Sequence, residues 1–273
     1  MSTPPLERDP DAIALRWLGT AGFQLRHRGH ELALDPYLSR PPGAVPDLHF
    51  SIEDLGGASL VLITHGHFDH AQDAATVALA AGADVVAPRA CLANLRRAGV
   101  PEERLAASED TPEVPWSDGV VRVIESRHIR FDARMVGRTV ARVVRGGALL
   151  RLLRLVRRYP MGSNSDFLIA VGGERILHSG SGGGDWGALA ALEPTVFLLP
   201  FAGRSDVIDY YLAALHRLRP RAVVLHHFDD FFPAFSEPYP VAAFVERMRA
   251  EHPDIPVTVP EPGVWFDLDR RPR

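Results

Sequence analysis

The sequence predicts an α/β protein, because short apolar runs alternate with longer stretches of helical spacing along the whole chain. The chain has 273 residues, of which 46% are hydrophobic, and this is enough to bury a large core within one domain. We therefore expect a single domain over residues 1–273, built of two similar layers.

The elements are expected in two halves, about 1–128 and 163–273, each with strands followed by helices. An antiparallel meander should open the first half, with Gly22 and Gly29 as breakers. The expected strands are Ile13–Leu18, Phe23–Leu25, Glu31–Leu34, Leu60–Ile63, Asp84–Ala87, Val120–Glu125, Asp166–Val171, Arg175–His178, Thr195–Leu199, Ala222–Leu225, Val257–Val259 and Val264–Leu268. The expected helices are Ala71–Ala81, Ala90–Ala98, Trp186–Leu192, Asp206–Leu218 and Val241–Glu251.

Residues 129–162 fit neither half and predict a basic helical insertion. This stretch is rich in arginine and holds one acidic residue, Asp132. Arg151, Arg154 and Arg158 recur at positions i, i+3 and i+7, which predicts an amphipathic helix with one basic face. The other face of this helix should carry Leu149, Leu152, Leu153 and Val156.

Three imidazoles and a carboxylate lie within six residues at the end of a buried strand. The run His65-Gly66-His67-Phe68-Asp69-His70 follows the apolar residues 60–64. These are the ligand types that borderline-soft divalent metals such as zinc prefer. The spacing lets His65 and His67 reach one ion while Asp69 and His70 point to a second position nearby, as in two-metal sites. The sequence thus predicts a metal site, and the alternative is a His-rich surface turn.

This pattern resembles the His-x-His-x-Asp-His signature of the metallo-β-lactamase superfamily. The resemblance implies a four-layer αββα sandwich with the site at the junction of its halves. Because lactonases, thioesterases, phosphodiesterases, ribonucleases and β-lactamases share the signature, it predicts fold and metal more specifically than substrate. The segments Trp17–Phe23, Asp35-Pro36-Tyr37 and His227–Phe232 also resemble a bacterial branch of zinc hydrolases related to the ascorbate-phosphate lactonases.

The resemblance implies further ligands outside the cluster. His128, which follows the strand Val120–Glu125, matches the third ligand of the first metal. His227 matches the last ligand of the second metal, with His226 as the alternative. Asp35 would orient a ligand imidazole from behind, unless it only starts a turn.

One position departs from the superfamily pattern. An Asp in a Ser-Gly-Asp-like turn commonly bridges the two metals, and here Ser181 stands at that place. Asp185 is expected either to reach back to the second metal or to cap a helix that starts at Trp186. The metal count, one or two ions per chain, stays open, and Mn2+ or Fe2+ could replace Zn2+. His178, just before the turn, is expected to pack or hydrogen-bond in the core.

Hydrolysis is the chemistry that these ligands predict. His65, His67 and His128 would leave a fourth coordination position for water, and zinc lowers the pKa of such a water to about 7. Asp69 would bind a second metal or, without that ion, act as the catalytic base. We therefore expect a zinc-dependent hydrolase that acts on a small-molecule ester, lactone or phosphodiester.

The basic helix bears on the nature of the substrate. Arg151, Arg154 and Arg158 could bind an anionic head group while the apolar face meets acyl chains, which favours an anionic or lipid-like substrate and allows peripheral contact with anionic lipid. A phospholipase D of this superfamily acts on N-acylated ethanolamine lipids, which is an analogy at the level of fold. An oligomerisation or packing helix is the alternative, and the oligomeric state stays open.

Other classes are less consistent with the composition. The net charge of −4 and the absence of aromatic residues interleaved with the arginines of 134–158 argue against nucleic acid, although nucleases share the His cluster. A non-catalytic metal-binding or ligand-binding scaffold is the remaining alternative. Cys91 is the only cysteine, so no internal disulfide forms, and no run of about 18 apolar residues exists. A cytoplasmic location is expected.

Overall fold

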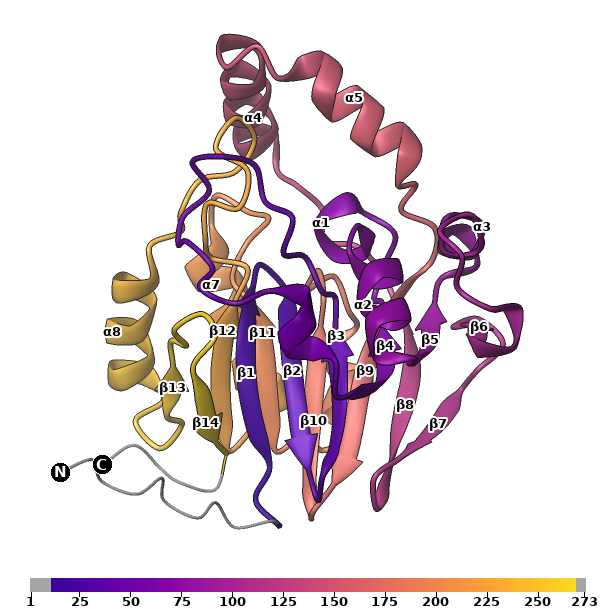
Figure 1. Ribbon diagram of the computed structural model, residues 1–273. Coiled ribbons are helices and arrows are strands. Elements are labelled where there is room, and N and C mark those ends of the chain that lie inside the picture. The colour runs from indigo at the N-terminus through magenta and orange to yellow at the C-terminus, as the bar shows by residue number, and fades with distance from the viewer. Residues whose placement is uncertain (1–10, 269–273) are drawn as a thin grey trace, which may run out of the picture.

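The computed structural model describes residues 11–268 and contains two seven-stranded mixed sheets that face each other between layers of helices (Figure 1). The first sheet has the order β14 (Trp265–Asp267), β1 (Ala14–Gly19), β2 (Gly22–His27), β3 (His30–Leu34), β4 (Ala58–Leu62), β5 (Asp84–Ala87) and β6 (Leu105–Ala107). The second has the order β13 (Val257–Thr258), β12 (Ala222–His226), β11 (Val196–Pro200), β10 (Glu174–Ser179), β9 (Asn164–Val171), β8 (Gly119–Ser126) and β7 (Glu113–Trp116). The predicted αββα sandwich is confirmed.

Helices cover the outer face of each sheet. The first sheet is covered by η1 (Ile52–Leu55), α1 (Phe68–Ala71), α2 (Ala74–Ala81), α3 (Arg89–Arg97) and η2 (Glu102–Arg104). The second is covered by α6 (Trp186–Ala190), α7 (Val207–Leu218) and α8 (Val241–Glu251). No helix within residues 11–268 is long and apolar enough to cross a membrane.

The main core lies between the two sheets and follows the alternation of strand side chains. In β9, Phe167 and Ile169 point to the inter-sheet core, whereas Leu168 points to the helices on the other face. Leu15 and Trp17 of β1 enter the same inter-sheet core from the opposite sheet. The strand ends are therefore held rigidly, and the loops that leave them have fixed starting points.

The two layers do not follow the chain halves 1–128 and 163–273. Strand β8 of the first half pairs with β9 in the second sheet, and β7 follows it there by pairing with β8. Strand β14 at the end of the second half pairs with β1 in the first sheet. Strands β6 and β7 were also not predicted. β7 lies at a sheet edge and contains Pro115, which suits an edge because proline cannot donate to a ladder.

The insertion contains two helices where the sequence predicted one. α4 (Ala133–Arg145) was missed, and α5 (Leu149–Arg158) matches the predicted basic helix. Gly146 and Gly147 connect them, and Gly147 has a positive φ of 61°. Figure 1 shows both helices at the top of the view, beyond the strand ends and near α1. They form a cap over that end of the molecule.

Candidate metal centre

Three imidazoles from two sheets form the first group of candidate metal ligands. His65 and His67 leave β4 and His128 follows β8, and their ligand atoms lie within 4.8 Å of one another. Nε2 of His65 is 3.0 Å from Nδ1 of His67. A zinc ion with tetrahedral Zn–N bonds of about 2.05 Å requires its nitrogens to be roughly 3.3 Å apart. The three side chains therefore already converge almost as metal ligands do.

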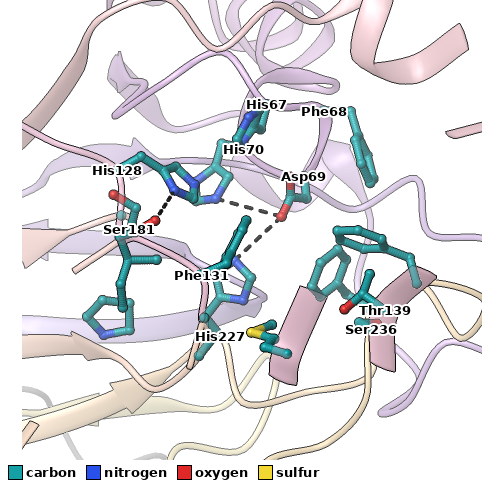
Figure 2. A pocket seen from close by; sticks show the side chains of 18 of the residues that line it. His67, Phe68, Asp69, His70, His128, Phe131, Thr139, Ser181, His227 and Ser236 are labelled. Atoms are coloured by element: carbon teal, nitrogen blue, oxygen red, sulfur yellow. Dashed lines mark hydrogen bonds and ion pairs between the residues drawn. The ribbon is translucent and has the colours of Figure 1, made fainter. Parts of the chain in front are cut away.

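Asp69, His70 and His227 form the second group, drawn from α1 and from the loop after β12. Oδ2 of Asp69 lies 3.8 Å from Nε2 of His70 and 3.5 Å from Nε2 of His227 (Figure 2). The two groups adjoin, because the ring centroids of His65 and His70 are only 3.9 Å apart. The arrangement offers two neighbouring positions for cations.

The outer nitrogens of three candidate ligands have partners that fix the orientation of each ring. Nδ1 of His65 contacts Oγ1 of Thr64 at 3.0 Å, and Nδ1 of His128 contacts the backbone carbonyl of the next residue at 3.0 Å. Nδ1 of His70 contacts Oδ2 of Asp35 at 2.8 Å. In each case Nε2 is left to face the centre, which is the usual support for metal-binding histidines.

Asp35 is fully buried and does more than start a turn. Its Oδ1 accepts a hydrogen bond of 2.7 Å from the backbone N–H of Thr64, and its Oδ2 accepts one of 2.6 Å from the hydroxyl of Thr64. Burial alone would raise the pKa of this carboxyl, but His70 and His178 outweigh it and hold the pKa below its usual range. Asp35 is thus an ionised acceptor behind His70.

Burial decides the charge of the first group. Desolvation lowers the pKa of His65 well below its ordinary value, lowers the pKa of His67 to about 4, and lowers the pKa of His128. These rings are neutral near pH 7, the form that binds metal. His70 differs, because Asp35 and Asp69 outweigh its desolvation and raise its pKa.

His227 lies in the site and His226 does not. Nε2 of His226 contacts the backbone carbonyl of Leu198 at 3.1 Å, and its ring stacks on His178 with centroids 5.1 Å apart. Both of these rings are fully buried in the core. His178 therefore packs where the sequence placed it, and the preference for His227 over His226 agrees with the geometry.

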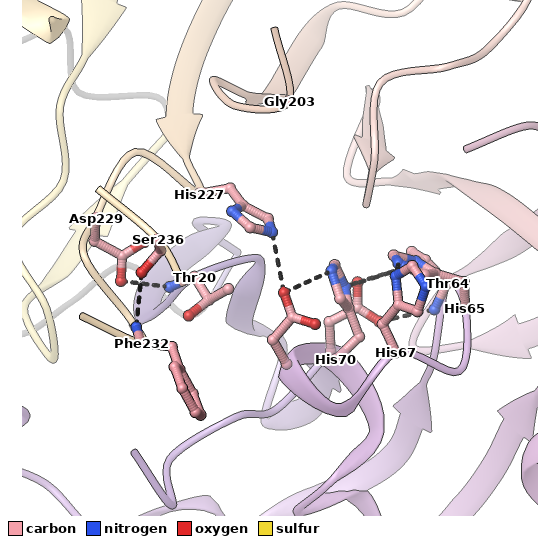
Figure 3. A network of polar contacts seen from close by, with 12 residues as sticks. Thr20, Thr64, His65, His67, His70, Gly203, His227, Asp229, Phe232 and Ser236 are labelled. Atoms are coloured by element: carbon pink, nitrogen blue, oxygen red, sulfur yellow. Dashed lines mark hydrogen bonds and ion pairs between the residues drawn. The ribbon is translucent and has the colours of Figure 1, made fainter. Parts of the chain in front are cut away.

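A polar network that sequence reasoning missed holds the turn of His227 (Figure 3). His227 has a φ of 58°, and its N–H donates to the backbone carbonyl of Thr20 at 2.7 Å. The N–H of Thr20 donates in turn to Oδ2 of Asp229 at 3.0 Å, and Arg40 pairs with the same carboxylate. The only sequence signal for this network was Asp229, the acidic residue two positions after His227.

The position that departs from the superfamily pattern carries no carboxylate in the structure. Oγ of Ser181 donates to Oδ1 of Asn164 at 3.1 Å. Asp185 lies outside both ligand groups, and its Oδ1 instead accepts from the N–H groups of Gly187 (2.9 Å) and Ala188 (3.2 Å) at the start of α6. This corrects the expectation that Asp185 reaches back to the second metal; it caps the helix.

The glycines of this turn allow close approach of other chain segments. A Cβ on Gly180 would lie 2.1 Å from Oγ1 of Thr64, and one on Gly183 would lie 2.1 Å from the carbonyl oxygen of Arg127, next to His128. Larger residues would displace the segments that present His65 and His128. The glycine run therefore shapes the site.

Gly66, between two candidate ligands, is joined to the end of the insertion. Its N–H donates to the carbonyl of Met161 at 2.7 Å, and a Cβ on Gly66 would lie 2.1 Å from the carbonyl oxygen of Pro160. No side chain fits between these two backbones. The cap helix α5 is thus fastened directly to the ligand loop.

A pocket of about 270 Å³ opens from the metal ligands toward the cap. One end is formed by residues of both groups, and the walls are mostly apolar, as Figure 2 shows in part. Among the wall residues are Phe131, Met135, Leu152, Val156, Phe231 and Phe235. The structure joins the candidate ligands to an apolar chamber under α4 and α5.

The structure places the predicted substrate-binding arginines outside this pocket. Arg151 and Arg158 line a separate depression, where they lie over the rings of Phe232 and Tyr159, and Arg154 lines neither. Because the helix is rotated this way, Leu152 and Val156 face the pocket. Among the described residues, the arginine that lines the pocket is Arg142 of helix α4.

Two facing sheets between helices, with two adjoining His and Asp groups at the strand ends, define a metal-dependent hydrolase of the metallo-β-lactamase type. The family model of the β-lactamase superfamily domain matches residues 14–227, and the chain belongs to this family.

Relatives extend the match over nearly the whole chain. A UPF0173 metal-dependent hydrolase of Aeropyrum pernix is 27% identical over 266 residues, which cover 93% of this chain and 97% of the relative. A UPF0173 metal-dependent hydrolase of Anaeromyxobacter sp. is 29% identical over 254 residues, which cover 86% and 78%. Among solved structures, the metallo hydrolase Igni18 of Ignicoccus hospitalis has a TM-score of 0.67 at 20% identity, covering 95% of this chain and all of that one.

Proposed function

We propose that this metal-dependent hydrolase uses zinc to cleave an ester, lactone or phosphodiester that carries an apolar, lipid-like group. The observation that supports the proposal is the continuity of the two ligand groups with the apolar pocket under the cap. Metal would meet the scissile group at one end, and the apolar part of the substrate would occupy the rest.

The residues present fit two zinc ions. His65, His67 and His128 would hold the first, and the second group, which includes Asp69, would hold the other. Zinc lowers the pKa of a bound water and polarises the oxygen of the substrate. Asp69 has Oδ2 directed at both imidazoles of its group, which favours a ligand role. If only the first ion is bound, the same oxygen is free to accept a proton as catalytic base.

The wall of the pocket favours a lipid-like substrate over an anionic one. Arg142 is paired with Glu237 and donates to the backbone carbonyl of Ser236 at 3.0 Å. Its guanidinium is therefore already engaged by Glu237, which also pairs with Arg138 at 3.3 Å. Near Arg142 the lining also includes Thr139, Ser236 and Tyr239, which are polar but uncharged, and the rest of the wall is mostly apolar. An acyl or alkyl chain would gain about 25 cal/mol for each Å² of apolar surface that it buries here.

Two other functions stand as alternatives. A non-catalytic scaffold is favoured by Ser181 in place of the bridging carboxylate. A nuclease is favoured only by the shared ligand pattern, because residues 11–268 provide the pocket with no free cationic side chain for a phosphate backbone.

Elemental analysis tests the metal, and a substrate panel tests the chemistry. Protein purified without chelators should contain about two zinc ions per chain. It should hydrolyse aryl esters or lactones with medium acyl chains faster than their short-chain analogues, and bis(p-nitrophenyl) phosphate tests the diester class.

The His67→Ala variant should lose one ion and reduce kcat/KM by at least about 100-fold. The Ser181→Ala variant is the matched control, because Ser181 lies in the same pocket without being a ligand, and it should change little. Full activity in the His67→Ala variant would contradict the mechanism. Protein that binds zinc but hydrolyses none of the panel would favour the scaffold.

A cytoplasmic location forms part of the same proposal. It is supported by Cys91, a free and buried thiol with no partner for a disulfide. Fractionation of the native host with an antibody against the chain would test it.

A further inference from the structure

The cap carries a concentration of exposed apolar side chains. Of the thirteen large hydrophobic residues that are exposed within residues 11–268, nine lie between 131 and 161. Leu150 is 69% exposed and Val144 is 62% exposed. The others of the nine are Phe131, Val136, Val140, Leu149, Leu153, Val156 and Met161. Single exposed apolar residues are ordinary, whereas a cluster of this kind marks an interaction site.

The outward side of α4 explains part of this cluster. Met135, Thr139 and Arg142 line the pocket, so that face of the helix points inward. Val136 and Val140 recur four residues apart on another face and are about half exposed, as is Val144 one turn later. The helix therefore lines the pocket with a mixed face and presents a separate apolar face to solvent.

Arginines that lack a partner border the apolar residues. Arg134 and Arg145 on α4, and Arg154 and Arg157 on α5, have no ion pair or hydrogen bond from their side chains within the described residues 11–268. Residues 133–158 contain no Asp or Glu. The outer surface of the cap is thus apolar and cationic at once.

We propose that α4 and α5 form a docking surface for a membrane with anionic lipids. Apolar side chains would enter the boundary between head groups and acyl chains, and the arginines would contact the lipid phosphates. The contact is peripheral, because neither helix is long enough to cross a bilayer.

Charge favours a membrane over a second copy of the chain. In a symmetric dimer the same surface faces itself, so unpaired arginines would approach arginines with no acidic residue of 133–158 to compensate them. An anionic bilayer supplies the complementary charge.

The docking surface is continuous with the rim of the pocket. Phe131 and Val156 line the pocket and are 47% and 53% exposed, so they lie at its rim. A bilayer in contact with the cap would therefore lie against the pocket opening. This inference goes beyond the proposed hydrolysis and does not depend on it, because docking needs neither metal nor turnover.

Co-sedimentation with vesicles tests the proposal without measuring activity. The full chain should bind vesicles of equimolar phosphatidylcholine and phosphatidylglycerol, and bind vesicles of phosphatidylcholine alone much more weakly. Because each arginine contributes about a fivefold factor at an anionic surface, the Arg145→Glu/Arg157→Glu variant should bind about 30-fold more weakly or worse. The matched control Arg217→Glu/Arg249→Glu reverses two exposed arginines on α7 and α8, and it should lose far less binding.

A second pair of variants tests the apolar part. The Leu150→Asp/Leu153→Asp variant should lose binding even at low salt, whereas Leu79→Asp, which alters an exposed leucine on α2, should retain it. All of these side chains are exposed, so the core is left intact. Equal binding by both arginine variants would overturn the proposal. The proposal would also be overturned if the unaltered chain bound no vesicles and instead formed a dimer in sedimentation velocity. The Leu150→Asp/Leu153→Asp variant would then dissociate that dimer.

Discussion

Replacing Asp35 with Asn should weaken the second metal position while leaving the first intact. The carboxylate of Asp35 accepts four hydrogen bonds, two from Thr64, one from Nδ1 of His70 and a longer one of 3.4 Å from Nε2 of His178. An amide has only one acceptor oxygen. If that oxygen still accepts the hydrogen bond from the backbone N–H of Thr64, the amide NH2 group faces Nδ1 of His70. Nδ1 must then accept a hydrogen bond, so the proton of the imidazole moves to Nε2. Nε2 is the nitrogen that faces Asp69, and it cannot bind a metal while it carries the proton.

The magnitude follows from this geometry. Loss of a partner behind a ligating histidine typically lowers metal affinity by 10- to 100-fold, about 1.4 to 2.7 kcal/mol. In the metal-free protein, a hydrogen bond to a charged acceptor contributes about 1.5 to 3 kcal/mol, so the Asp35→Asn variant should unfold at lower denaturant concentration. The loss of zinc affinity should fall on one of the two binding steps.

A competition titration with a fluorescent zinc chelator measures the two steps separately. The matched control is Asp73→Asn, because Asp73 is another buried carboxylate with several donors: it accepts three hydrogen bonds, from the N–H groups of Leu38 and Ser39 and from the hydroxyl of Ser39. This control should lose comparable stability and keep both zinc affinities. An Asp35→Asn variant with unchanged affinity at both steps would refute the role assigned to Asp35, and equal loss in both variants would show that it acts only through stability.

Three other changes have defined outcomes. The Asp185→Ala variant should lose about 1 kcal/mol of stability in chemical denaturation, because it removes a helix cap, and should keep its metal content; a lost ion would restore the ligand role. Burial raises the pKa of Asp166 from 3.8 to about 6, so the folded state holds this proton more tightly than the unfolded state does. The folded state therefore loses about 3 kcal/mol of stability as the pH rises from the lower of these values to the higher. In chelator-treated protein, the Asp166→Asn variant should lack this fall between pH 4 and pH 6, and an unchanged pH profile would argue against it. Chelator treatment should abolish hydrolysis, and zinc should restore it, whereas activity that persists with no measurable metal would contradict a metal-dependent reaction.

The sequence indicated most of the site because its residues follow strand ends. His65, His67, Asp69 and His70 come directly after a buried apolar run, and His128 follows another. The apolar runs of these strands show in the sequence where each following loop begins. The residues next to each strand end could therefore be predicted to lie in the site.

Features that depend on tertiary contacts could not be predicted in this way. Helix α4 was missed because it holds Gly137 and several β-branched residues, which have low helix propensity, and because its apolar side faces solvent. The support of His227 by Asp229 runs through Thr20, which is more than 200 residues away in sequence. The placement of β8 in the second sheet and of β14 in the first is likewise decided by pairing partners that are distant in the chain, β9 and β1.

The backbone contact between Gly66 and residues 160–161 gives the cap a thermodynamic link to the metal position. The peptide that separates His65 from His67 is held by the same hydrogen bond that ends the insertion. A membrane that orders α5 therefore also orders the loop that carries His65 and His67. A metal ion that orders this loop must in turn favour the same placement of α5. Linkage of this kind is reciprocal: a membrane that tightened zinc binding tenfold would itself be bound tenfold more tightly by the zinc-loaded chain.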